Sequence, residues 1–226
     1  VVEDARFEFK ENGLHARVVD ASHVAMINME VDSAAFDTWE IEETDLGLEL
    51  RKVKELISLG AADDMIEMAY TPTSGVMTLN LGKIDRNIRP LDNTTISSPN
   101  VPKIDIPSKV VMSGAALAQA LRAAKQVGDL VNLSIDSETF TVHVQGQTDS
   151  VTVSFAKDEL ASLECTKPAR SQYSLTYLVP MAKVFAGLGE ITLGFGESFP
   201  LQLSFSFNDG AGEVVYYLAP RVESEY

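Results

Sequence analysis

The chain has little cysteine, few basic residues and no long apolar segment. Cys165 is its single cysteine, which excludes an intramolecular disulfide and a cysteine-based zinc cage and fits a reducing compartment. No stretch approaches the ~18 consecutive apolar residues of a membrane span, and no basic-then-apolar leader precedes Val1. We therefore expect a cytoplasmic protein with no membrane partner. Lys and Arg number 18 against 33 Asp and Glu, a formal charge of −15. This balance argues against a protein that coats nucleic acid with its whole surface, yet it allows a local basic face on an acidic body.

Alternating apolar and polar residues recur along the chain and indicate antiparallel sheet with one face in water. Residues 5–9 and 14–18 flank the turn-forming pair Asn12-Gly13 and predict a hairpin. Further strands are expected at 24–31, 38–42, 65–70, 76–81, 83–91, 105–112, 131–135, 139–144, 150–155, 173–175, 191–195, 201–207 and 213–218. Helical spacing is confined to the short segments 50–59, 115–127 and 175–188, where Pro180 obscures the start of the last. The pattern predicts an α+β fold.

The chain reads as two similar halves joined by a linker. Residues 92–104 are polar with two prolines, which favours a connecting loop between domains at 1–91 and 105–226; the alternative is a long surface loop within one domain. The helix at Leu50 and its two following strands return about 125 residues later, and so does the hairpin at Ala5. The second copy opens with a strand and a helix that the first lacks. We therefore expect roughly 20 residues carrying that strand and helix to precede Val1.

Three motifs resemble the proliferating cell nuclear antigen family, the DNA sliding clamps of archaea and eukaryotes. They are Asp20-Ala21-Ser22-His23-Val24, the helix from Ser113-Gly114 to Val127-Gly128-Asp129, and the C-terminal run Val215-Tyr216-Tyr217-Leu218-Ala219-Pro220-Arg221-Val222-Glu223. The resemblance covers essentially the whole chain and is of the archaeal type. It implies a duplicated clamp fold in which antiparallel sheets lie outside and short helices line the inner face. Three subunits would close head to tail around duplex DNA.

The resemblance also implies a processivity factor without catalytic activity, cofactor or metal. It would tether DNA polymerase, clamp loader, ligase and flap nuclease through their short docking motifs. The location would be the archaeal cytoplasm, on the nucleoid, or the nucleus in a eukaryote. Two other functions stay open. One is a specialised subunit of a heteromeric ring, and the other is a β-rich hydrolase with a carboxylate pair, although no two carboxylates stand at a defined spacing.

Three sets of site residues follow from the resemblance. The DNA-facing set is Arg51, Lys52, Lys54, Arg122, Lys125 and Lys183. The docking set for partner peptides is Val19, His23, Val24, Val101, Pro102, Pro200, Tyr217, Leu218, Ala219 and Pro220, with exposed backbone expected from Ala219 to Val222. The subunit-interface set is Ile84, Arg86, Ile88, Leu163 and Cys165, on edge strands at 83–91 and 160–166. Glu55, Gln119 and Gln126 dilute the basic faces, which favours mobile, salt-sensitive contact with DNA.

Overall fold

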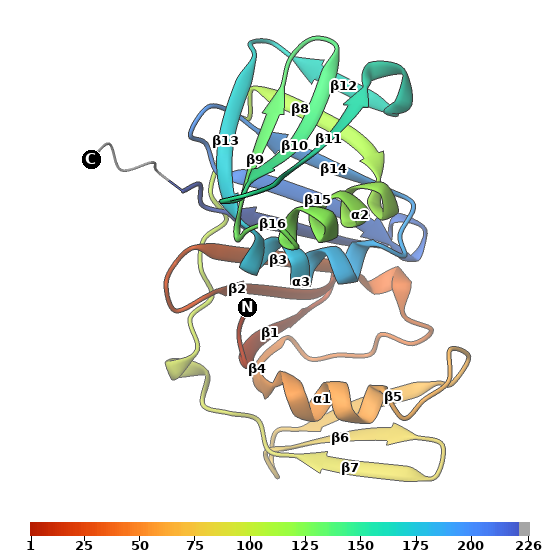
Figure 1. The fold of residues 1–226 in the computed structure, drawn as a ribbon. Coiled ribbons are helices and arrows are strands. Elements are labelled where there is room, and N and C mark those ends of the chain that lie inside the picture. Colours follow the sequence, from red (N-terminus) through yellow and green to blue (C-terminus); the bar gives the residue numbers. More distant parts are fainter. Residues whose placement is uncertain (222–226) are drawn as a thin grey trace.

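The computed structural model describes residues 1–221, which form β-sheets with α-helices packed against them (Figure 1). The first half consists of β1 (Asp4–Lys10), β2 (Gly13–Val19), β3 (Ala25–Asp32), β4 (Thr44–Glu49), α1 (Leu50–Ile57), β5 (Ile66–Thr71), β6 (Val76–Leu81) and β7 (Ile84–Ile88). The second half consists of β8 (Ser108–Ser113), α2 (Gly114–Lys125), β9 (Leu130–Ile135), β10 (Thr139–Gln145), β11 (Ser150–Ala156), β12 (Ser162–Cys165), β13 (Ala169–Ser174), α3 (Leu175–Phe185), β14 (Glu190–Phe195), β15 (Leu201–Phe207) and β16 (Gly212–Leu218). The predicted α+β class is confirmed.

One nine-stranded antiparallel sheet runs through both halves, in the order β12-β8-β14-β15-β16-β3-β2-β1-β4. The halves join where β16 pairs with β3, from Gly212 opposite Val31 to Leu218 opposite Ala25. This junction is a continuous backbone ladder, so the two halves are held by hydrogen bonds as well as by packing.

The strand orders repeat, as expected for a duplicated fold. The four-stranded sheet β11-β10-β9-β13 has the same order and connections as β3-β2-β1-β4. The three-stranded sheet β5-β6-β7 likewise repeats β14-β15-β16. Each strand of the junction therefore has a counterpart: β11 corresponds to β3, and β7 corresponds to β16.

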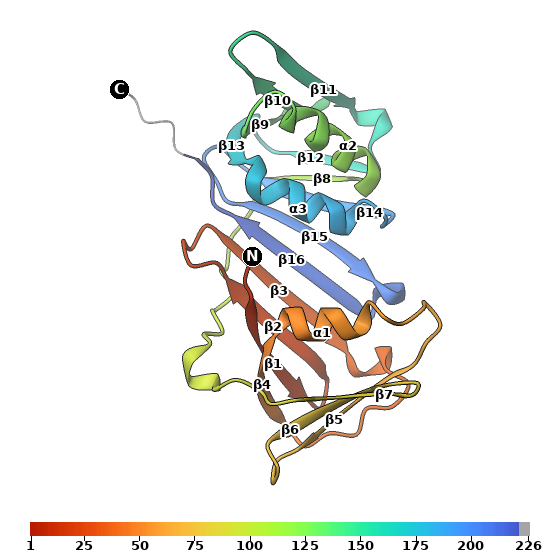
Figure 2. The same ribbon diagram turned by 60° about the horizontal axis from the view of Figure 1, so that its bottom comes forward.

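The helices α1, α2 and α3 lie on the same face of the nine-stranded sheet (Figure 2). We call this the inner face and the opposite one the outer face. The helices pack on this face through their apolar sides. Leu117 and Leu121 of α2 and Leu178 of α3 are buried together with Tyr216 in the core of the second half, which we call the second core. Burying each such side chain contributes about 1.5–3 kcal/mol. Leu56 of α1 is buried in a separate, smaller core in the first half, which we call the first core.

Local signals account for the helix boundaries. Ser113 caps α2 by accepting a hydrogen bond from the Ala116 amide at 3.4 Å. Gly114 follows it, and a side chain there would meet Phe185 O at 2.4 Å, so only glycine lets α2 approach α3 this closely. The prediction for α3 was uncertain at Pro180, but the helix begins at Leu175 and continues through that proline.

One predicted strand is wrong. Residues 38–42 form no strand, and the strand of this region is β4, which starts at Thr44. Trp39 and Ile41 do alternate toward the first core, and the Trp39 indole donates to Lys10 O at 3.0 Å. The alternation of apolar residues at 38–42 therefore reflects side chains that pack on the first core. It does not mark a strand, because the backbone of this segment pairs with no neighbouring strand.

The segment from Arg89 to Pro107 carries no strand and runs along the outer face, from the first half to the second (Figure 1). Leu91 N donates to Gly47 O at 2.8 Å and the Asn93 side chain donates to Asp45 O. A side chain at Gly47 would meet Ile96 Cδ1 at 2.8 Å, so this glycine admits the linker onto β4. The linker predicted at residues 92–104 lies within this segment.

Candidate functional site

A row of side chains crosses the outer face at the ends of four strands. Val19 of β2 lies opposite Met26 of β3, Met26 opposite Tyr217 of β16, and Tyr217 opposite Gln202 of β15. Residues directly opposite in an antiparallel sheet share a face, so all four point away from the helices. Val19 and Tyr217 belong to the predicted docking set, whereas Met26 was missed. Met26 is only 8% exposed, and no sequence pattern separates a covered outward residue from a core residue.

Asp20 fixes the loop between β2 and β3. Its Oδ1 accepts hydrogen bonds from the amides of Val24 at 2.7 Å and Ala25 at 2.8 Å, and its Oδ2 accepts one from the Tyr177 hydroxyl of α3 at 3.0 Å. Burial raises the pKa of Asp20, but these hydrogen bonds outweigh it and hold the pKa below the ordinary value. The loop presents His23, which is exposed and has a φ of 54°.

The remaining docking residues divide into surface and core. Val24, Val101, Pro102, Pro200, Ala219 and Pro220 are half-buried. Leu201 pairs with Leu218, which brings Pro200 beside Ala219. Leu218 itself has no exposed surface and belongs to the second core, so its prediction as a peptide contact is wrong for this structure. Its neighbour Tyr217 points outward because successive side chains of a strand alternate.

The backbone after β16 is less free than predicted. Ala219 N donates to Val24 O at 2.8 Å, and Arg221 N donates to Gln172 O at 2.7 Å. These two amides already have acceptors and offer a peptide no free donor. Val222 and Glu223 of the C-terminal motif lie outside the described residues.

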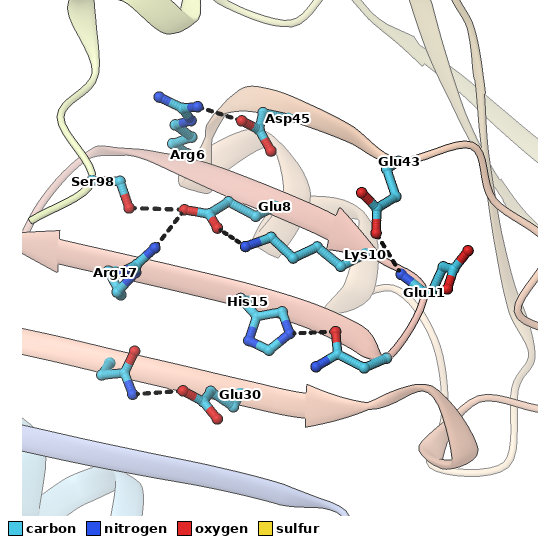
Figure 3. Close-up of polar contacts among 12 residues, drawn as sticks. Arg6, Glu8, Lys10, Glu11, His15, Arg17, Glu30, Glu43, Asp45 and Ser98 are labelled. Atoms are coloured by element: carbon cyan, nitrogen blue, oxygen red, sulfur yellow. Dashed lines mark hydrogen bonds and ion pairs between the residues drawn. The ribbon is translucent and has the colours of Figure 1, made fainter. Parts of the chain in front are cut away.

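The linker crosses a charged cluster on the outer face of β1 and β2 (Figure 3). Glu8 Oε1 accepts from Ser98 Oγ at 2.9 Å and Arg17 Nη2 at 3.0 Å, and Lys10 Nζ lies 2.7 Å from Glu8 Oε2. Burial raises the pKa of Glu8, but the hydrogen bonds from Lys10, Ser98 and Arg17 outweigh this and lower the pKa to about 2. Arg6 pairs with Asp45 beside them.

The predicted DNA-facing residues all lie on the inner-face helices, but their charges are not equally available. Arg51 Nη1 is 3.5 Å from Glu55 Oε1, and Lys52 Nζ is 2.6 Å from Glu49 Oε1. Lys125 pairs with Asp129. Within residues 1–221, Lys54, Arg122 and Lys183 have no ion-pair partner, and all three are exposed. Among residues 1–221, three of the six predicted cations are therefore paired with carboxylates and three are not.

The predicted interface residues occupy two free sheet edges. β7 ends the three-stranded sheet and β12 ends the nine-stranded sheet. Ile84 is 43% exposed and Arg86 is half-buried, bonded to Glu55 at 3.2 Å, whereas Ile88 is only 5% exposed in the first core. Leu163 and Cys165 are half-buried against the second core.

A third free edge was missed. β11 ends the four-stranded sheet, and Val151, Val153 and Phe155 along it are only partly buried. The duplication offers the signal that could have found it, because β11 is the counterpart of β3, the strand at the junction between the halves.

A hollow of about 380 Å³ lies away from the docking residues, beside Ser134, Asp136, Thr139 and Arg170. Among residues 1–221, no three His, Cys, Asp or Glu side chains gather as a metal site would require. None of the described helices is long and apolar enough to cross a membrane.

Comparisons with known proteins agree with this geometry. The family model of the proliferating cell nuclear antigen N-terminal domain matches residues 1–95, and that of the C-terminal domain matches residues 100–221. The chain is 34% identical over 226 residues to a protein of Methanosarcina acetivorans named DNA polymerase sliding clamp, and 35% identical over 228 residues to one of Methanosphaerula palustris with the same name. In both cases the match covers the whole of this chain and 92% of the relative.

Solved structures extend the match to three dimensions. A structure described as the C-terminal region of FEN-1 bound to A. fulgidus PCNA has a TM-score of 0.93 and 29% identity, covering 100% of this chain and 92% of that one. PCNA of Thermococcus kodakaraensis shares the fold, with a TM-score of 0.89, 24% identity, and coverage of 97% and 91% of the two chains. Sequence and structure therefore agree: the chain belongs to the proliferating cell nuclear antigen family of DNA sliding clamps.

Proposed function

We propose that this chain is one subunit of a homotrimeric ring that encircles duplex DNA and holds DNA-processing proteins on it, without catalysis of its own. The observation that carries the proposal is the β16–β3 junction. It joins two copies of one fold edge to edge while keeping α1, α2 and α3 on one face. Repeating the same junction between chains produces a curved wall with helices inside.

The duplication selects the strands that would join neighbouring subunits. Since β7 is the counterpart of β16 and β11 the counterpart of β3, we propose that β7 of one chain pairs with β11 of the next. This replaces the expectation that the strand at 160–166 makes the contact, because β12 sits next to β8 and has no counterpart at the β16–β3 junction. An edge of one kind meeting an edge of another is a head-to-tail contact, and such contacts form a ring when the rotations between successive subunits add up to a full turn.

The ring explains how an acidic protein can act on DNA. Encirclement needs no tight contact, so the net charge of −15 can remain on the body while Lys54, Arg122 and Lys183 face the hole. Contacts from a few exposed cations are mobile and weaken with salt. We expect this action in the cytoplasm, on the nucleoid, since the relatives compared are archaeal.

The outer face would receive partners. We propose that the docking surface consists of Val19, His23, Val24, Met26, Val101, Pro102, Pro200, Tyr217, Ala219 and Pro220. Its partners are a DNA polymerase, the clamp loader, a ligase and a flap nuclease that carry short motifs with an apolar plug. The A. fulgidus structure with the C-terminal region of FEN-1 supports a peptide-binding role for this family.

Native mass measurement tests the assembly. The proposal expects one species of three times the mass of the full-length chain. A stable monomer, or a defined ring formed only after a second kind of chain is added, would contradict the homotrimer. The latter result would favour a specialised subunit of a heteromeric ring.

A further inference from the structure

Glu8 is a buried carboxylate that bridges two segments distant in sequence. It is 6% exposed, and its Oε1 accepts hydrogen bonds from Arg17 on the neighbouring strand and from Ser98 in the linker (Figure 3). Lys10, two residues along the same strand, supplies a third donor to Oε2. A carboxylate removed from water is costly unless its oxygens are satisfied, and here donors engage both of them.

The charges around Glu8 are set so that it stays ionised. Lys10 and Arg17 are cations, and the pKa of Glu8 is lowered to about 2 by its hydrogen bonds despite burial. Ser98 therefore donates to a full negative charge, and hydrogen bonds to ionised groups are roughly twice as strong as neutral ones. Lys10 belongs to β1 and Arg17 belongs to β2. Of the three donors to Glu8, Ser98 is therefore the one that lies in the linker.

The position of Ser98 divides the linker into two parts. Before it, Leu91 and Asn93 attach the chain to β4. After it, the structure shows no hydrogen bond from residues 99–106 to the rest of the described chain, and the next one is from Thr166 to Pro107 O at 2.9 Å. Val101 and Pro102 of the docking surface lie in this part, which has no hydrogen bond to the rest of the described chain.

We propose that the Glu8–Ser98 hydrogen bond is a latch that fixes the linker on the outer face and so positions Val101 and Pro102 for partner docking. Glu8 and Ser98 are positioning residues in this account, since they act through the linker and not on the partner. The consequence for docking rests on the proposed function, whereas the latch itself does not. A linker already fixed at Ser98 has less freedom to lose when a peptide binds, so binding is tighter than to a loose linker.

The latch is tested first without any partner, by hydrogen exchange of the linker amides in the full chain. Ser98→Ala removes the donor at a linker position, and Ser97→Ala is the matched control because Ser97 is exposed and its side chain has no hydrogen bond among the described residues. We expect amides 94–96, which donate to Asp92 and Asn93, to exchange about tenfold faster in Ser98→Ala, as for loss of a hydrogen bond to a charged group. Ser98→Thr, which keeps the hydroxyl, should restore slow exchange.

Glu8→Gln gives the second arm, because it keeps the shape of the side chain and removes its charge. The amide oxygen of the substituted side chain can still accept from Ser98 but carries no charge, so this variant should loosen the same amides by less than Ser98→Ala. Equal exchange in the wild type, Ser98→Ala and Glu8→Gln would overturn the latch. So would faster exchange in Ser97→Ala to the same extent, since the effect would then not depend on Glu8.

Calorimetry with a peptide carrying a clamp-docking motif measures the consequence for docking. We expect Ser98→Ala to weaken binding three- to tenfold, with Ser98→Thr close to wild type. Tighter binding by Ser98→Ala would overturn the positioning role, because the latch would then compete with the partner. A wild-type chain that binds no such peptide would refute the proposed docking function and leave the exchange result to decide on the latch.

Discussion

The proposed contact between subunits predicts a position-specific effect of proline in β11. Lys157 N donates to Glu138 O and Gly146 N donates to Asp149 O, which fixes the hydrogen-bonding phase of the β10–β11 ladder. In that phase the amides of Val151 and Val153 point toward β10, and the amide of Thr152 points to the free edge. Thr152 is exposed, so Thr152→Pro removes an edge donor without breaking the ladder inside the chain.

The size of the effect follows from the lost hydrogen bond. Its removal leaves a carbonyl of the neighbouring chain unpaired at a covered edge, which costs about 1–3 kcal/mol per contact. This corresponds to a dissociation constant raised by about 5- to 150-fold. Sedimentation equilibrium over a concentration series should show the ring dissociating at correspondingly higher protein concentration. Circular dichroism should show the strand content of the monomer unchanged.

Leu163→Pro is the control on β12, the other edge considered, because the amide of Leu163 points to the free edge whereas that of Glu164 faces Lys109 of β8. Leu163→Ala accounts for the loss of the half-buried Leu163 side chain. We expect Leu163→Pro to leave the ring intact. A ring lost in Leu163→Pro but kept in both Leu163→Ala and Thr152→Pro would refute the argument from the duplication and return the contact to β12.

Three further predictions concern charge and docking. The pKa of Glu8 is about 2 in the folded chain against 4.5 ordinarily, so its stabilisation is complete above pH 4.5 and is lost as pH falls toward 2. Denaturant unfolding should show the stability advantage of wild type over Glu8→Gln shrinking by about 2 kcal/mol between pH 7 and pH 3; an unchanged difference would contradict the lowered pKa. Replacing Arg122 and Lys183 together by Glu should leave the sedimentation of the ring unchanged and weaken its low-salt association with DNA, and wild-type association across a salt series would show that these charges only face solvent. Tyr217→Ala should weaken a docking peptide by tenfold or more in calorimetry while the ring persists, and wild-type affinity would place the docking surface elsewhere.

Much of the fold could be predicted because its strands follow simple alternation. The hairpin of β1 and β2 and the helix α2 were found from turn residues, apolar spacing and the Ser113 cap. The strand order across β16 and β3 could not be found in this way, because pairing between residues almost 200 positions apart leaves no local signal. The same holds for Glu8 and Ser98, which are ordinary polar residues until the linker brings them together.

The site was predicted less completely for a related reason. Alternation tells which residues of a strand share a face but not which face is covered. The resemblance placed Leu218 in the docking set although it is core, and Met26 was overlooked although it lies between Val19 and Tyr217 on the outer face. Deciding between such residues requires the position of the helices and of the linker.

Encirclement of DNA is the central claim, and the order of end-blocking tests it most directly. Linear duplex DNA with biotin at both ends is incubated with the protein at low salt, and streptavidin is added either before or after the protein. We predict that the protein stays on DNA through a later high-salt wash only when the ends are blocked after it has entered, because a ring threads over free ends and cannot leave a closed track. Retention that is the same for both orders, or absent in both, would contradict a ring around DNA.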